Sequence, residues 1–265
     1  MHPILVQLGG LIVGTHNAFI ALGVAAAAVV FFLECRRRGE ISEQMLWIVG
    51  GALIAGAVGA KLTAILGAIG DPVRPALTPV ILHGGRSILG GLTGGYIGVV
   101  VTKRMVHYDR STGDLFAPAI ALGMAIGRWG CFFSELPGTP TTLPWGIRLS
   151  PLQLARIPNC PAYCRTAALH PSFAYEIVFH AVLFGLLWTR WRWQPSLRGE
   201  LLKVYLLCYS VFRFGVEFVR GNEVVWNGLT RHQLFIIPVF VWLALHFVQR
   251  RRSPATIASF VEEPS

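Results

Sequence analysis

Seven apolar stretches dominate this chain and restrict what it can fold into. Most of them are long enough to cross about 30 Å of hydrocarbon as a helix, and the third is shorter and rich in glycine. They cover roughly residues 11–33, 45–69, 87–101, 115–133, 172–189, 201–219 and 233–248. A helix satisfies its own backbone hydrogen bonds in lipid. The pattern therefore predicts an all-α fold, a polytopic membrane bundle of about seven transmembrane helices.

The composition supports a membrane protein and excludes a nucleic-acid-binding one. Only 14% of the 265 residues are charged and 54% are hydrophobic, whereas a soluble domain carries about 25% charged residues. The formal net charge is +10, but the basic residues lie in short runs at the ends of apolar stretches. Such runs anchor membrane helices and suit an anionic lipid surface. The predicted partner is therefore the membrane, with no nucleic acid.

The positions of these basic runs predict the orientation of the chain. Runs follow the first, third, fifth and seventh stretches, at residues 36–38, 103–110, 190–198 and 250–252. The positive-inside rule places those ends in the cytoplasm, so the N-terminus lies outside and the C-terminus inside. The N-terminus lacks a basic n-region, so the first stretch is interpreted as a retained span. We expect one transmembrane domain over residues 1–252, an extracytoplasmic loop at about 134–171, and a disordered cytoplasmic tail at 253–265.

Arginine and glutamate inside apolar stretches are the most unusual local feature. Arg213 and Glu217 lie four residues apart, and therefore share one helix face, among phenylalanine and valine residues. Ionisable groups are costly at membrane depth and usually face a polar cavity or a reaction site. The alternative is a buried ion pair with a purely structural role.

Further polar residues gather at the same ends of their stretches. They are Arg128 and Glu135 in the fourth, His170, Tyr175 and Glu176 at the start of the fifth, and Tyr209 and Arg220 in the sixth. Arginine keeps its charge in any environment and holds a phosphate with two N–H groups. Because all these ends lie outside in the predicted topology, we expect a single anion-binding site near the outer leaflet.

Two minor features complete the inventory of candidate sites. Gly90, Gly94 and Gly98 give the third stretch a bare face that favours close helix packing, and Arg86 follows two glycines where a helix begins, as in some phosphate-binding loops. Cys160 and Cys164 lie in one outer loop and are candidates for a disulfide. A cysteine pair without further ligands gives weak support for a metal, so we predict neither metal nor cofactor.

Three sequence blocks resemble the prolipoprotein diacylglyceryl transferases of bacterial inner membranes. They are the Gly-Arg-x-Gly block from Gly127 to Glu135, the His-Pro-Ser-x-x-Tyr-Glu block from His170 to Glu176, and the block from Tyr209 to Arg220. The Gly-Gly-Leu-x-Gly stretch at residues 90–94 also fits. The blocks occur in the same order as in the family and span most of the chain.

The resemblance implies a multi-pass inner-membrane enzyme of lipoprotein biosynthesis. Such an enzyme moves a diacylglyceryl group from phosphatidylglycerol to the lipobox cysteine in the signal peptide of a preprolipoprotein. The resemblance implies catalytic roles for Arg128, Glu135, Arg213 and Glu217. The two arginines would hold the phosphate, and the two glutamates would orient the arginines or manage protons. The resemblance also implies substrate binding by Arg128 and by six further residues: Arg86, His170, Tyr175, Glu176, Tyr209 and Arg220.

The chain departs from the family pattern at three places. Leu89 stands where the family usually carries a histidine that is a candidate base, Cys131 replaces an asparagine, and Asn17-Ala18 stands near a missing Tyr-Gly motif. Leucine cannot transfer a proton. Three alternatives follow: another base such as His83 or Glu217, a different acceptor, or a protein that binds phospholipid without transfer.

Overall fold

The computed structural model describes residues 4–8, 11–69, 88–155 and 161–252, and these are mostly helical. They belong to two compact units, one made of residues 1–34 and 112–265 and the other of residues 35–111. Five helices in the described part of the chain are long and apolar enough to cross a membrane. The prediction of a helical membrane protein is therefore confirmed.

The larger unit contains α1 (Thr15–Arg38) up to Glu34, α5 (Gly113–Ser134), α7 (Ser172–Thr189), α8 (Leu201–Val216) and α9 (Arg231–Arg252). The smaller unit contains the last turn of α1, α2 (Glu43–Ile69) and α4 (Ile88–Met105). Short elements connect the helices: α6 (Pro151–Ala155) and the 3-10 turns η1 (Ala162–Arg165), η2 (Trp191–Trp193), η3 (Pro195–Leu197) and η4 (Glu217–Val219).

Two expectations about the fold were wrong in detail. The first span does not begin at Leu11, because β1 (Ile4–Leu8) pairs antiparallel with β2 (Leu11–Gly14) and the helix starts only at Thr15. Aliphatic and β-branched residues favour strands when a neighbouring strand can pair with them. The fold is also not purely helical, since β3 (Pro140–Thr141) pairs antiparallel with β4 (Ala168–Leu169), and β5 (Val224–Trp226) forms a hairpin with β6 (Leu229–Thr230).

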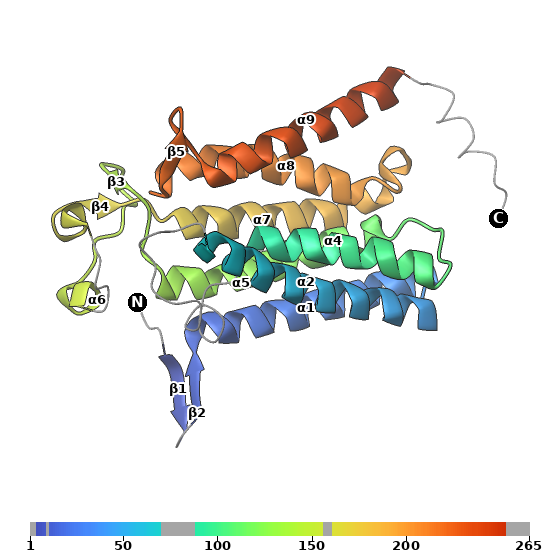
Figure 1. Cartoon of the computed structure of the whole chain (residues 1–265), viewed down its shortest axis with the longest axis horizontal. Coiled ribbons are helices and arrows are strands. Elements are labelled where there is room, and N and C mark those ends of the chain that lie inside the picture. The colour runs from blue at the N-terminus through green and yellow to red at the C-terminus, as the bar shows by residue number, and fades with distance from the viewer. Residues whose placement is uncertain (1–3, 9–10, 70–87, 156–160, 253–265) are drawn as a thin grey trace. The chain divides into compact units, whose positions relative to one another are not determined.

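Helix α5 is the central helix of the larger unit (Figure 1). Half of its most apolar window is buried, the largest share among the five long helices. The small residues Gly23 and Gly123 let α1 approach α5 closely. On the side of α7 and α8 the core consists of buried apolar side chains: Ala117, Ala121, Leu183, Leu187, Leu201 and Tyr205.

Two buried carboxylates, Asp114 and Glu34, hold helix ends in the larger unit. Asp114 accepts hydrogen bonds from the backbone N–H groups of Gly199 at 2.7 Å and Leu201 at 3.0 Å, where α8 begins. This arrangement satisfies N–H groups that have no partner inside the helix. Glu34 near the end of α1 forms an ion pair of 2.6 Å with Arg192, which follows α7.

In the smaller unit α2 and α4 pack through their glycines. A methyl group added at Gly94 would collide with the carbonyl oxygen of Ala55, and one added at Gly98 would collide with that of Gly51. Close backbone contact is the usual role of small residues in membrane helices. The prediction of a packing face on α4 is confirmed.

Candidate active site

Two arginines and one glutamate form a buried cluster where α5, α7 and η4 meet. Arg128 Nη2 lies 2.5 Å from Glu176 Oε2, and Arg220 forms an ion pair with the other oxygen of the same carboxylate. The Glu176 side chain is fully buried, and those of the two arginines are 5% and 13% exposed. We call these three residues the two-arginine cluster. One carboxylate faces two guanidinium groups, so the cluster carries a surplus positive charge.

The packing of three elements brings these residues together. Arg128 lies near the end of α5 and Glu176 near the start of α7, and the two helices pack together over much of their length. Arg220 follows η4, and its guanidinium carbon stacks 4.6 Å from the ring centre of Phe173. The cation–π contact and the carboxylate together hold Arg220 at the site.

A second buried ion pair lies at the end of α8. Arg213 pairs with Glu217 across one helical turn, as their spacing predicts. Glu217 also accepts hydrogen bonds from Asn222 at 2.7 Å and Thr230 at 2.8 Å, and lies 3.2 Å from His232 Nδ1. We call these five residues the one-arginine cluster. Its charges balance, and Oε1 of its carboxylate accepts two hydrogen bonds.

Sequence reasoning missed three members of this cluster: Asn222, Thr230 and His232. A signal for them exists in Asn227-Gly228, which has positive φ at both residues, 47° and 82°. Asn-Gly with this backbone conformation is the preferred two-residue hairpin turn. The turn folds β6 back on β5, and Thr230 of β6 donates to Glu217.

The remaining predicted residues lie around these clusters. Tyr209 is buried, with its ring centre 5.2 Å from that of His180. His170 Nδ1 lies 3.1 Å from the hydroxyl oxygen of Tyr175, which accepts a hydrogen bond of 2.8 Å from Trp145. Tyr175 is thus tied to the segment between α5 and α7, whereas the adjacent Glu176 is buried in the bundle. Arg86 and His83 lie outside the described residues.

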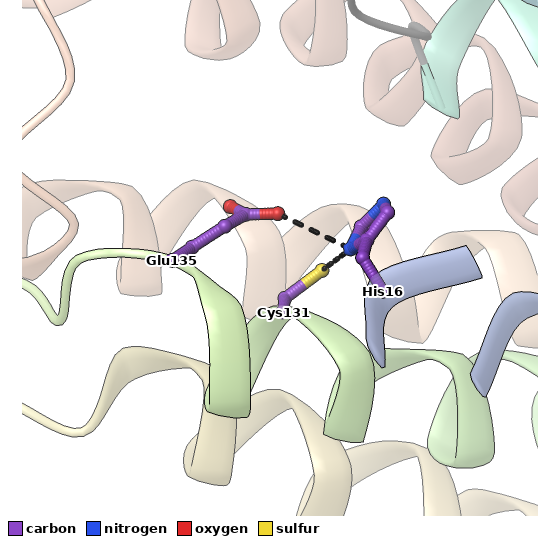
Figure 2. Close-up of side chains that lie close together, drawn as sticks. All are labelled: His16, Cys131 and Glu135. Carbon is purple, nitrogen blue, oxygen red and sulfur yellow. Dashed lines mark hydrogen bonds and ion pairs between the residues drawn. The ribbon is translucent and has the colours of Figure 1, made fainter. Parts of the chain in front are cut away.

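Glu135 does not continue the helix that carries Arg128. Helix α5 ends at Ser134, and Glu135 has an extended backbone as its C-cap. Its carboxylate lies 3.7 Å from Nδ1 of His16, which in turn lies 3.8 Å from Sγ of Cys131 (Figure 2). The carboxylate partner of Arg128 is therefore Glu176, and Glu135 belongs to a separate group with His16 and Cys131.

Two cavities open beside these residues. One has a volume of about 330 Å³ and is lined by Glu135, Leu136, Pro137, Phe173, Arg220 and Asn222, among others. The other has a volume of about 240 Å³ and an apolar wall that includes Phe132, Phe133 and Leu149. A charged cavity next to an apolar one matches the two parts of a phospholipid, the head group and the acyl chain.

The segment between α5 and α7 contains a disulfide-bonded cysteine. Cys164 is buried in η1 and takes part in a disulfide bond. Cys35, Cys131 and Cys208 form no disulfide bond. Cys160 lies outside the described residues, so its pairing with Cys164 stays a prediction.

Comparison with known proteins gives these clusters a family context. A family model described as prolipoprotein diacylglyceryl transferase matches residues 3–249. The phosphatidylglycerol–prolipoprotein diacylglyceryl transferase of Gloeobacter violaceus is 32% identical over 239 residues, which cover 88% of this chain and 86% of the relative. The Clostridium tetani protein of the same name is 31% identical over 84% of this chain and 86% of its own length. The chain therefore belongs to the prolipoprotein diacylglyceryl transferase family.

Proposed function

We propose that this protein transfers the diacylglyceryl group of phosphatidylglycerol to the lipobox cysteine thiol of preprolipoproteins. Both the family and its relatives' names support this reaction. The observation that carries it to individual residues is the surplus positive charge of the two-arginine cluster beside the 330 Å³ cavity. The protein is a bacterial membrane enzyme, and we place it in the cytoplasmic membrane.

In the reaction the thiol sulfur forms a bond to the glycerol carbon that bears the phosphate ester. The carbon–oxygen bond breaks, its electron pair stays on the phosphate oxygen, and glycerol phosphate leaves. Negative charge grows on that oxygen in the transition state. Donors fixed around a developing charge in a site that excludes water are the strongest contribution that a protein makes to such a step.

We assign the stabilising role to Arg128 and Arg220. Glu176 holds both guanidinium groups but neutralises only one charge. Glu217 fixes the orientation of Arg213. The positive charge of Arg213 interacts electrostatically with the Glu176 carboxylate in the two-arginine cluster. Tyr209, His170 and Tyr175 shape the surroundings, and Arg86 is retained as a substrate-binding candidate.

We further propose seven spans with the N-terminus outside, a single transmembrane domain over residues 1–252, and an extracytoplasmic loop at about 134–171. Helices α4 and α8, with 18 and 16 residues, serve as the two spans beyond the five long ones. In this topology the ends of α5, α8 and the start of α7 face the outer leaflet, where exported preprolipoproteins arrive.

Complementation tests the proposal directly. A bacterial host is depleted of its own transferase, this chain is expressed, and lipoproteins are analysed by mass spectrometry for a diacylglyceryl thioether. We expect the modification to return. Well-expressed, membrane-inserted protein that restores no thioether would contradict the proposal, and retained binding of phosphatidylglycerol vesicles would then support the alternative, a phospholipid-binding family member without transfer.

A further inference from the structure

Three potential metal ligands from two helices converge on one point. His16 is the second residue of α1, Cys131 lies in the last turn of α5, and Glu135 is the C-cap of α5. The imidazole nitrogen, the thiol sulfur and a carboxylate oxygen all lie within 4.8 Å of one another (Figure 2). Cys131 lies in the last turn of α5, and the extended backbone at Glu135 turns its carboxylate toward the same ring nitrogen of His16.

The geometry argues against a catalytic relay. In a relay of cysteine, histidine and carboxylate, the two partners use different ring nitrogens. Here Cys131 and Glu135 both approach Nδ1 of His16, at 3.8 Å and 3.7 Å. The nitrogen–oxygen distance also exceeds the roughly 3.2 Å limit of a good hydrogen bond. The three atoms surround a common centre instead of forming a chain.

These separations suit a shared metal ion. Zinc bonds of about 2.3 Å to sulfur and about 2.0–2.2 Å to nitrogen and oxygen give tetrahedral edges of roughly 3.3–3.6 Å. The two edges from His16 Nδ1 are 3.8 Å to sulfur and 3.7 Å to oxygen, and the sulfur–oxygen edge is within 4.8 Å. We propose that His16, Cys131 and Glu135 bind a divalent ion of the zinc class, with a fourth position open to an incoming thiol.

A charged donor lies beside the cysteine. Arg128 Nη1 lies 4.0 Å from Cys131 Sγ and donates toward it. Donors around a coordinating thiolate are typical second partners of metal sites, and they stabilise the deprotonated form. Nitrogen and sulfur ligands select zinc over magnesium or calcium, which prefer oxygen alone.

The three ligands lie beside the candidate active site. The side chains of His16 and Glu135 are 40% and 44% exposed, whereas Cys131 is buried. Glu135 also lines the 330 Å³ cavity together with Arg220 of the two-arginine cluster. Three protein ligands with one open position are the usual arrangement of a catalytic zinc site.

This role rests on the proposed function. The metal ion would promote loss of the thiol proton, which Leu89 cannot accept. A thiol that binds such an ion loses its proton, which passes to water at the exposed side of the site. The bound thiolate sulfur then attacks the glycerol carbon, the carbon–oxygen bond breaks, and glycerol phosphate leaves and takes up a proton from water. Atoms and charges balance without a histidine at position 89.

Metal binding is tested without any measurement of activity. The full chain is purified in detergent, loaded with Co²⁺, and examined for the sulfur-to-cobalt charge-transfer band in the near ultraviolet and for tetrahedral d–d bands. We expect one equivalent of Co²⁺, displaced by Zn²⁺. Cys131→Ser and Cys131→Asn, the second of which restores the residue usual in the family, should both lose the charge-transfer band.

Cys208→Ser is the matched control, because Cys208 is a free thiol elsewhere in the same unit. It should keep the full spectrum. A wild-type protein that binds less than a tenth of an equivalent of Co²⁺, or a Cys131→Asn spectrum equal to that of the wild type, would overturn the site.

The open position is tested with a lipobox peptide. Adding the cysteine-containing peptide to the Co²⁺ protein should about double the charge-transfer intensity, because a second thiolate joins the ion, and the same peptide with serine should have no effect. An unchanged spectrum with the cysteine peptide would overturn thiol capture. The cobalt spectra need no turnover. They therefore test the metal site separately from the transferase activity, which the complementation experiment tests.

Discussion

The two buried arginine–glutamate clusters use similar residues but have opposite electrostatic balance. In the two-arginine cluster, Glu176 faces both Arg128 and Arg220. In the one-arginine cluster, Glu217 faces Arg213 alone and accepts further hydrogen bonds from Asn222 and Thr230. The first has positive charge left over, and the second has none.

This difference separates binding from positioning. A buried cation without a full counter-charge is costly, and an anionic substrate that neutralises it recovers part of that cost. A pair whose charges already balance gains little from a further anion. We therefore infer that the two-arginine cluster holds the lipid phosphate, whereas the one-arginine cluster fixes α8 and the β5–β6 hairpin beside it.

The largest effect should come from breaking the balanced cluster. Arg213→Ala leaves Glu217 buried without its counter-charge, and such a loss costs about 3–5 kcal/mol. We expect transfer activity to disappear together with a clear fall in the apparent melting temperature in detergent.

A charge-neutral double variant sharpens this test. Arg213→Met combined with Glu217→Gln removes both charges at similar volume, so it should recover most of the lost melting temperature. If Arg213→Ala melts like the wild type and yet is inactive, Arg213 holds substrate directly and the contrast between the clusters is broken.

The next largest effect should come from the two-arginine cluster, on activity and with less change in stability. Arg128→Ala leaves Glu176 paired with Arg220, so the carboxylate keeps a counter-charge. We expect transfer to a lipobox peptide to fall by about 100- to 1,000-fold, the usual effect of removing one donor to a developing anion. Arg231→Ala, at an exposed position, is the control. More than half of wild-type activity in Arg128→Ala would refute the assigned role.

The smallest effect should come from an ion pair in the smaller unit, where water competes. Glu40 accepts a hydrogen bond of 2.7 Å from Tyr108 and pairs with the exposed Arg110 at 2.9 Å. The Tyr108 hydroxyl and the Arg110 charge lower the pKa of Glu40. The stabilisation is therefore present above the ordinary pKa of about 4.3 and is lost as the pH falls through the lowered value.

Glu40→Gln should cost about 1 kcal/mol at pH 7. The difference in melting temperature between variant and wild type should shrink as the pH is lowered below about 4. A difference that stays constant over this range would show that the carboxylate charge does not contribute.

Local features of the site followed from the sequence, while partners from distant segments did not. Arg213 and Glu217 are one helical turn apart, so their pairing needed only helix periodicity. The pairing of Arg128 with Glu176 depends on how α5 and α7 are aligned, and no local pattern encodes that alignment. Glu135 follows Arg128 by seven residues, but α5 ends at Ser134 and the extended backbone at Glu135 turns its side chain toward His16.

The sequence by itself determined the membrane class, the helices and the three motif blocks, because hydrophobic length and helix spacing act over short distances. The tertiary structure decided which charges neutralise each other and which do not. Cys131 shows the physical reason: it is separated from His16 by 115 positions, and only the close packing of α1 on α5 brings their ligand atoms to 3.8 Å. The surplus charge and the candidate metal site are therefore properties of packing, not of any single segment.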